Sequence, residues 1–418
     1  MSDCRRDCRT CRNWRGIEGG NPGNNKKLPP YPTNCLNLKL CKGVFTLSNK
    51  KLRNWIFTLH RYLGLALGLI AIIIGLTGSL LVFHTEIDNF DQHLQSGSII
   101  LQGKQLPIEA VVNTVKKAYA DQPDATIQRY YPSTKSDQSI KVILKTKESD
   151  WLPIYVNPYT GVILNPNSKP SSLQKIFLDI IYPLHYTLLS GDIGTKFVGI
   201  VGLLFTILSI TGIILWSGWR KLIAGFKIKW NAHPKWVNFD VHKVAGVITA
   251  TFLVFTFFTG FCWNFSEFVN PIIYALTFSK PQPDLVSVPI SGQLPLGLKD
   301  QLKIAQAALP NASLSLIGFP SKPEETFWFN FNLGDVSLDQ YSGKVLQVST
   351  TATASLGDRI LNSFSDLHYG TFWGLPSRIF YMFVGFAPLI LFITGFLMWK
   401  HRYRTKSPTE FINQSLLR

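Results

Sequence analysis

The sequence predicts a membrane protein of the α+β class, with four transmembrane helices in two tandem repeats and an exterior α+β domain inserted in each repeat. Three observations predict this fold: long apolar runs, positive charge confined to a few short segments, and motifs that recur at a nearly constant interval along the chain. The chain has 418 residues and is 46% hydrophobic but only 16% charged. This composition is typical of proteins that cross a lipid bilayer.

Four apolar runs are long enough to span a membrane, because a helix needs about 20 apolar residues to cross the hydrocarbon core. These runs cover 62–83, 195–217, 241–263 and 376–399. The first run lies too far from the N-terminus, and is too long, to be the apolar core of a signal peptide. We therefore expect it to remain in the protein as the first membrane helix.

The distribution of positive charge predicts how these helices are oriented. Residues 1–53, 218–240 and 400–418 hold 22 basic and five acidic residues, so their excess, 22 − 5 = 17, equals the net charge of the whole chain. Because basic flanks stay on the cytoplasmic side, both termini and the 218–240 loop are expected inside, and 86–175 and 266–360 outside. We expect a multi-pass protein of the bacterial inner membrane with periplasmic domains, and no nucleic-acid partner.

The cysteines lie outside the expected exterior segments, so no disulfides are expected there. Cys4, Cys8 and Cys11 have the spacing C-x3-C-x2-C, which is compatible with an iron–sulfur cluster. However, residues 16–34 are rich in glycine, proline and asparagine. We therefore favour a disordered basic tail over residues 1–50 rather than a cluster.

Several motifs occur twice at nearly the same interval, which indicates an internal duplication. LHRYLG at 59–64 corresponds to VHKVAG at 241–246, PLHY recurs as DLHY, NPYTGVIL as DQYSGKVL, and TGIILW as TGFLMW. One unit of about 53–221 is thus expected to repeat as 235–404. Because each unit holds two spans, both enter the membrane in the same orientation, and a pseudo-twofold axis along the membrane normal is expected.

Each expected exterior domain begins with an amphipathic helix, at 107–119 in the first repeat and at 297–308 in the second. A turn follows later in each domain, where Gly161 or Gly343 adopts a positive φ easily. Between helix and turn, alternating apolar and polar residues predict strands at 139–146, 152–156 and 326–332. A helix followed by a strand meander is an α+β layer.

These signals divide the chain into two tails, four spans, two exterior domains and one cytoplasmic loop. In order, the segments are 1–50 (basic tail), 51–85 (first span), 86–170 (first exterior domain), 171–218 (interfacial helix and second span), 219–236 (loop), 237–265 (third span), 266–352 (second exterior domain), 353–400 (interfacial segment and fourth span) and 401–418 (cytoplasmic tail).

The motifs LHRYLGLALGLI, TGSLLVF, Y-T/S-G-x-V, LHY and TG-x-x-L/M-W resemble those of the PepSY-associated transmembrane family, and the resemblance covers residues 50–404. It implies that the exterior domains are PepSY domains. It also implies the activity of the best-defined members, which are inner-membrane ferric-siderophore reductases with two b-type haems. On this basis we expect electrons to reach a periplasmic ferric siderophore or other ferric chelate from an unidentified donor, such as a quinol or a dehydrogenase.

The same resemblance allows a second function of a different class. PepSY domains are also associated with binding or inhibiting peptidases, so the protein would then be a non-enzymatic membrane protein that binds or regulates peptidases or other envelope partners. In that case the recurring histidines would be structural. Bound haem in the purified protein would distinguish the two functions.

Four of the eight histidines recur in both repeats, and they are the candidate cofactor ligands. A low-spin b haem takes two axial imidazoles on opposite sides of its ring. Equivalent residues approach each other near a pseudo-twofold axis. We therefore expect His60 to pair with His242 near the inner face and His185 with His368 near the outer face, each pair holding one haem iron.

Two further histidines are alternative ligands: His84 for the outer haem or the chelate site, and His401 for the inner haem. Arg61 and Lys243, which follow the inner histidines, are expected to reach the membrane surface or to pair with haem propionates. The sequence contains no dinucleotide fingerprint and no hydrolase triad or HExxH motif, so a separate electron donor is expected. Candidates for chelate docking are Arg129, Tyr130, Tyr131 and Trp328.

The separation of the two expected haems is a difficulty for this hypothesis. If the outer site lies level with His84, the helix from His60 to His84 rises about 36 Å. That distance is long for a single electron transfer between two cofactors.

Overall fold

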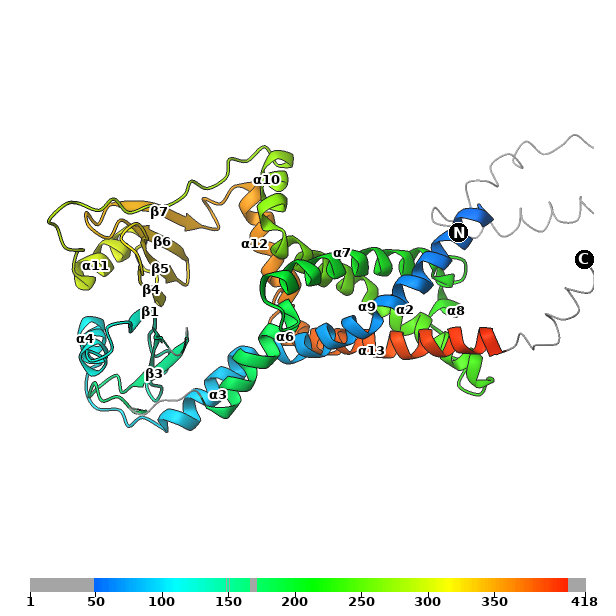
Figure 1. The fold of residues 1–418 in the computed structure, drawn as a ribbon, viewed down its shortest axis with the longest axis horizontal. Coiled ribbons are helices and arrows are strands. Elements are labelled where there is room, and N and C mark those ends of the chain that lie inside the picture. Colours follow the sequence, from blue (N-terminus) through cyan, green and yellow to red (C-terminus); the bar gives the residue numbers. More distant parts are fainter. Residues whose placement is uncertain (1–48, 148, 150, 166–170, 405–418) are drawn as a thin grey trace, which may run out of the picture.

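The computed structural model describes residues 49–147, 149, 151–165 and 171–404, and it shows a helical bundle with a separate layer of strands and short helices at one end (Figure 1). Within these residues, four helices are long and apolar enough to cross a membrane. They are α2 (Lys50–Leu81), α7 (Gly191–Leu215), α9 (Pro234–Asn264) and α13 (Leu375–Arg404). The predicted membrane α+β class is therefore confirmed. The candidate cluster of Cys4, Cys8 and Cys11 lies outside the described residues.

Local sequence signals set where the spanning helices begin. The side chain of Asn49 accepts hydrogen bonds from the backbone N–H groups of Lys51 and Leu52 at 3.0 and 3.4 Å, and so caps α2. Pro234 occupies the first turn of α9, where its missing N–H costs nothing. Helix α2 starts 62 − 50 = 12 residues and α9 starts 241 − 234 = 7 residues before the apolar runs that predicted them, because the more polar flanks of a span also form helix.

The four spanning helices pack into one bundle with α7 against α9 and α2 against α13. The rings of Phe205 and Phe257 stack between α7 and α9, with centroids 4.9 Å apart. On the other side, α2 and α13 approach so closely that a methyl group at Gly75 or Gly385 would collide with the facing helix. Small residues at such contacts allow membrane helices to pack backbone to backbone.

The layer outside the bundle, here called the exterior layer for its place relative to the bundle, is built on one seven-stranded antiparallel sheet in the described part of the chain, with the order β3-β2-β1-β4-β5-β6-β7. The first three strands come from the segment between α2 and α7, and are β1 (Thr126–Tyr131), β2 (Ile140–Lys145) and β3 (Leu152–Val156). The others come from the segment between α9 and α13, and are β4 (Leu314–Gly318), β5 (Phe327–Phe331), β6 (Gly334–Leu338) and β7 (Val345–Thr350).

The two exterior segments share this sheet because β1 pairs with β4, with Arg129 opposite Gly318 and Tyr130 opposite Ile317. The sequence predicts two separate exterior domains, and the pairing of β1 with β4 is not among its predictions. One helix from each segment, α4 (Ile108–Ala118) and α11 (Leu298–Ala308), contributes apolar side chains to the same core. The glycine turns are present as expected, with φ of +74° at Gly161 and +68° at Gly343.

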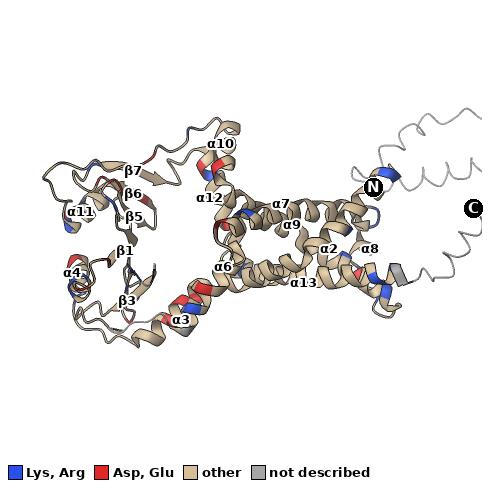
Figure 2. Ribbon diagram, viewed as in Figure 1, with Lys and Arg blue, Asp and Glu red and all other residues tan. Residues whose placement is uncertain are grey.

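Short helices connect the bundle to the exterior layer. After α2, the helix α3 (His84–Ser96) runs toward the sheet, and the chain returns through α5 (Ser172–Lys175), a π-helical segment (Ile176–Ile181) and α6 (Tyr182–Thr187). In the second half, α10 (Ser266–Leu276) follows α9, and α12 (Leu356–Tyr369) precedes α13. A 3₁₀ turn (Ser217–Trp219) and α8 (Leu222–Phe226) lie at the bundle end away from the sheet. Figure 2 shows basic residues at that end and few charges along the bundle.

Candidate functional site

The structure brings the four recurring histidines together in two pairs inside the bundle. We call His60 and His242 the inner pair, since they lie toward α8, and His185 and His368 the outer pair, since they lie toward the sheet. The ring centroids are 6.3 Å apart in the inner pair and 6.2 Å apart in the outer pair. The ring planes cross at 89° and 79°, respectively. These are the two proximities expected from the recurrence of the histidine motifs in the sequence.

Hydrogen bonds fix the protonation of the inner pair. The Nδ1 atom of His60 lies 2.9 Å from Thr211 Oγ1 and 3.2 Å from the carbonyl oxygen of Leu208. A carbonyl only accepts, and the Thr211 hydroxyl already donates to that same carbonyl at 2.7 Å, so Nδ1 must carry the proton. The Nδ1 atom of His242 donates in the same way to Thr394 Oγ1 at 2.8 Å, because that hydroxyl gives its proton to the backbone.

The outer pair has the same arrangement. The Nδ1 atom of His185 lies 3.1 Å from Thr77 Oγ1 and 3.0 Å from the carbonyl oxygen of Ile74. The Nδ1 atom of His368 lies 2.9 Å from Thr259 Oγ1. Both hydroxyls donate to carbonyls of their own helices, at 2.7 Å each, so both Nδ1 atoms are donors. In all four rings the Nε2 atom is therefore left with a lone pair, the form in which imidazole binds a metal.

Each anchoring threonine is followed by a glycine that lies beside the imidazole, and at Gly78 and Gly212 the missing side chain makes room for the ring. A Cβ atom at these glycines would lie 2.9 to 3.5 Å from the Cε1 atom of the anchored ring. The four Thr-Gly dipeptides, one in each spanning helix, are Thr77-Gly78, Thr211-Gly212, Thr259-Gly260 and Thr394-Gly395. Three of these dipeptides lie within the recurring motifs of the sequence, but no role was predicted for them. Their recurrence in every apolar run was the signal available.

The structure also corrects the expected depth of the outer pair. His185 is anchored at Thr77, about one turn before α2 ends at Leu81 and seven residues before His84. The stretch of α2 from His60 to Thr77 rises about 26 Å at 1.5 Å per residue. On α9, His242 and Thr259 have the same separation in sequence. The two pairs therefore lie about 26 Å apart along the bundle. The sequence-based separation of about 36 Å was too long, because it took the outer site as level with His84.

The outer pair borders a large cavity of about 1110 Å³ that extends from the bundle to the sheet. His84 lines this cavity without belonging to either pair, and its ring lies 6.3 Å from that of Tyr369. The Trp263 ring lies 4.6 Å from the His368 ring. Other aromatic and cationic residues on the wall are Tyr182, Tyr186, Arg129, Tyr131, Lys141 and Trp151.

The remaining residues singled out from the sequence lie elsewhere. Tyr130 is only 2% exposed in the core of the sheet, so its expected place at a docking surface was wrong. Trp328 packs against Gly318 and is not part of the cavity wall. His401 lies at the other end of the bundle, where it lines a smaller cavity of about 440 Å³ together with Thr394.

The two cations beside the inner histidines differ in their surroundings. Lys243 forms an ion pair with Asp240 at 2.7 Å, and both side chains are largely buried. The Nε atom of Arg61 is also buried, but it has no hydrogen-bond partner among the described residues. A buried guanidinium nitrogen without an acceptor is costly, so this atom fits beside an anionic group that the protein itself does not supply.

The histidine pairs fit the axial positions of a haem better than those of a bare metal ion. The described residues contain no group of three or more His, Cys, Asp or Glu side chains able to hold a metal ion. A porphyrin supplies four ligands itself and needs only two imidazoles. His60 and His242 would hold one such iron, and His185 and His368 the other, since the rings of each pair lie 6.3 and 6.2 Å apart.

A bundle of apolar helices with paired imidazoles at two depths, capped by an antiparallel sheet, defines a membrane α+β protein with candidate cofactor positions inside the bundle. The chain belongs to the PepSY-associated TM region family, whose model matches residues 57–402. The resemblance seen in the sequence motifs is thus confirmed. A search among curated proteins finds no match to this sequence.

Proposed function

We propose that this protein is a membrane oxidoreductase that holds two b-type haems and passes electrons across the bilayer to a ferric chelate such as a ferric siderophore. The observation that supports this proposal most is the fixed protonation of two facing imidazole pairs, because four Nδ1–H···Oγ bonds leave four Nε2 atoms ready to bind iron. Haem iron, when bound, supplies the one-electron redox chemistry.

The residues around the pairs bind, orient and shield such a cofactor. The threonines hold each ring at one tautomer and one rotation, and Gly78 and Gly212 leave room for the rings of His185 and His60. Arg61 offers a buried donor to an anionic substituent next to the inner pair. The apolar side chains of the bundle exclude water, which lowers the local dielectric and makes these fixed hydrogen bonds stronger.

The acceptor is proposed to dock in the cavity between the outer pair and the sheet. The guanidinium of Arg129 lies over the ring of Trp151 at 4.9 Å, so a cation and an aromatic face line the sheet side of the cavity together. Trp263 and His84 line the bundle side. Reduction of the chelated iron to Fe(II) weakens its binding to hard oxygen ligands, which would release it.

We further propose that the two halves arose by duplication and carry PepSY domains, and that the sheet is periplasmic while both termini are cytoplasmic in a bacterial inner membrane. The separation from His60 to Thr77 in sequence equals that from His242 to Thr259, which supports the duplication. The basic residues at the α8 end of the bundle support the orientation. The electron donor would be a separate quinol or dehydrogenase on the inner side.

The test is a haem count on the purified full-length protein from cells supplied with haem. We expect two haems per chain, a reduced α band of b type after dithionite, and reoxidation by an added ferric chelate. Alanine in place of one histidine of the inner pair should remove one haem, and alanine in place of one histidine of the outer pair should remove the other. His93→Ala, on the exposed side of α3, is the control and should keep both. Colourless wild-type protein would contradict the proposal and favour the peptidase-binding function.

A further inference from the structure

The helix α10 presents a stripe of large apolar side chains that stay exposed in the described structure. Phe268, Ile272 and Leu276 are 64%, 56% and 74% exposed, and their spacing of four residues places them on one face of the helix. Phe278, just beyond the end of α10, is 97% exposed. In water such a stripe would be unfavourable, since an exposed apolar patch usually marks a contact surface.

The opposite face of α10 is fixed to the rest of the protein. The hydroxyl of Tyr274 donates to Asp358 Oδ1 on α12 at 2.8 Å, and Gly357 leaves room for the Tyr274 ring. Near the start of α10, Glu267 forms an ion pair with Lys196 at the first turns of α7. These contacts set which face of α10 points away from the protein, so the exposed stripe is not a consequence of free rotation.

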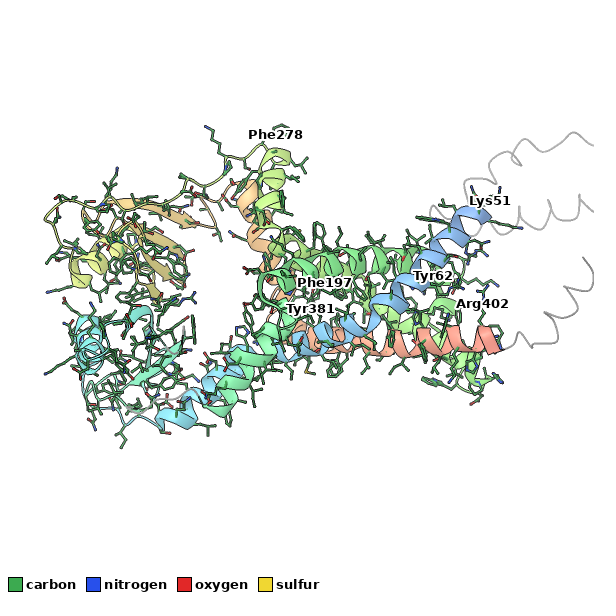
Figure 3. All side chains as sticks on the ribbon, viewed as in Figure 1. Lys51, Tyr62, Phe197, Phe278, Tyr381 and Arg402 are labelled. Carbon is green, nitrogen blue, oxygen red and sulfur yellow. The ribbon has the colours of Figure 1, made fainter. Side chains whose placement is uncertain are left out.

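The direction of α10 points to lipid as the occupant of this face. Figure 1 shows α10 projecting outward from the sheet-side end of the bundle, at a steep angle to the spanning helices and therefore close to the plane of a membrane that they cross. Figure 3 shows Phe278 at the far tip of this helix, away from the bundle and from the sheet. Since α9 ends at Asn264 and α10 begins at Ser266, the exposed face starts directly at the end of a spanning helix.

We propose that α10 and Phe278 are embedded in the lipid leaflet on the sheet side of the membrane, as an interfacial anchor in addition to the four spanning helices. An amphipathic helix in this position buries its apolar face among acyl chains and keeps its polar face toward protein and headgroups. Because Tyr274 of α10 is hydrogen-bonded to Asp358 of α12, the anchor holds α12, which carries His368, at the membrane surface.

The corresponding helix of the first half has a different partner. α3 carries several charged residues, and it contacts the sheet through the ion pair of Asp88 with Lys141 and through a hydrogen bond from Gln92 to Ser139 at 2.8 Å. Thus α3 supports the exterior layer, while α10 faces lipid.

Site-directed spin labelling of the full-length protein in lipid nanodiscs tests the anchor. Leu276→Cys and Phe278→Cys, each made in a variant that lacks the native cysteines, would carry a nitroxide label. Collisions with oxygen, which concentrates in lipid, would be compared with those of a water-soluble nickel chelate. Leu94 on α3, which is 63% exposed, provides the matched control position.

We expect the oxygen-to-nickel collision ratio to be several-fold higher at 276 and 278 than at 94. Equal ratios at all three positions would place α10 in water and overturn the proposal. If collisions with the nickel chelate at 276 and 278 decrease only at a high protein-to-lipid ratio, a second copy of the protein covers the stripe. This result would also contradict lipid insertion. The measurement does not depend on haem, so its outcome is separate from that of the proposed redox function.

Discussion

At the scale of single residues, the four threonines that face the histidines determine what the imidazoles can bind. Each threonine hydroxyl is committed to a carbonyl of its own helix, so it can only accept from the ring. The imidazole must then donate through Nδ1, and Nε2 is left as a ligand. A hydroxyl that commonly stabilises only its own helix thus sets the tautomer of a ring from another helix.

Replacing one such threonine should therefore weaken the cofactor site without unfolding the bundle. Thr211→Val keeps the shape but removes the hydroxyl acceptor of His60 and leaves only the longer contact of Nδ1 with the Leu208 carbonyl. We expect the affinity of the inner site for haem to fall by about 10- to 100-fold. Thr211→Ser should restore it. Haem titration of the apoprotein and the low-spin haem spectrum provide the measurement.

The control for this substitution is Thr249→Val, since Thr249 on α9 donates to the carbonyl of Ala245 in its own helix. It should bind haem as the wild type does. If Thr211→Val also shows unchanged haem affinity and an unchanged spectrum, the threonine does not position the ligand.

At the scale of elements, close helix packing makes the bundle sensitive to side-chain size at particular glycines. A Cβ atom at Gly385 would collide with Ser79 and with the backbone of α2, whereas one at Gly246 would lie 3.6 Å from Leu391, an ordinary contact. We expect Gly385→Ala to destabilise the bundle by about 1–3 kcal/mol through overpacking. Gly246→Ala should have little effect. Unfolding in mixed detergent micelles measures both, and equal stability of the two variants would contradict the close contact.

A second prediction concerns the ion pair that links α3 to α13. The hydrogen bonds from Arg378 to Glu86, 2.5 and 2.6 Å long, lower the pKa of the Glu86 carboxyl below its usual value. Because the pKa is lower in the folded state, the pair stabilises the protein above the unfolded pKa, and this contribution is lost as the pH falls through the folded pKa. Glu86 is half exposed, so we expect at most about 1 kcal/mol.

Thermal unfolding at pH 7 and at pH 4 tests this linkage. Glu86→Gln should lower Tm at pH 7 and lose less stability on acidification than the wild type. Glu109→Gln, on the exposed side of α4, is the control and should keep the acid sensitivity of the wild type. An acid sensitivity of Glu86→Gln equal to that of the wild type would show that this carboxylate does not contribute.

At the scale of the whole molecule, the exterior layer and the bundle form the large cavity together. Arg129 and Trp151 reach it from the sheet, and His368 borders it from α12. If a ferric chelate docks there, Arg129→Ala should raise KM for the chelate by about three- to thirtyfold, the equivalent of about 0.7–2 kcal/mol of lost cation–π and charge interaction. Haem content should stay unchanged.

Stopped-flow oxidation of the reduced protein over a range of chelate concentrations measures this effect. Lys344→Ala, which removes an exposed cation from the turn before β7, is the control for the loss of one positive charge. An equal rise in KM for both variants would indicate a general electrostatic effect and argue against docking in the cavity.

The amino-acid sequence by itself determined the membrane class, the approximate positions of the four spanning helices and the identity of the two histidine pairs. The spans were predictable because hydropathy depends only on the local sequence. The histidine pairs were predictable because the residues of recurring motifs were expected to meet near a common axis. Several elements outside the bundle, such as α4, α11 and β3, were also predictable from their periodicity. Strands β1 and β4 and the junction between them were not, because a short segment forms a strand only when a neighbouring strand pairs with it.

Only the tertiary structure decided which threonine meets which histidine, how deep the outer pair lies and where the large cavity opens. Thr211 and His60 are 151 residues apart, and Thr77 and His185 are 108 residues apart. Their meeting depends on the rotation and the axial position of each helix within the bundle. Those two quantities are set by the packing of all four helices together, so no local pattern in the sequence contains them.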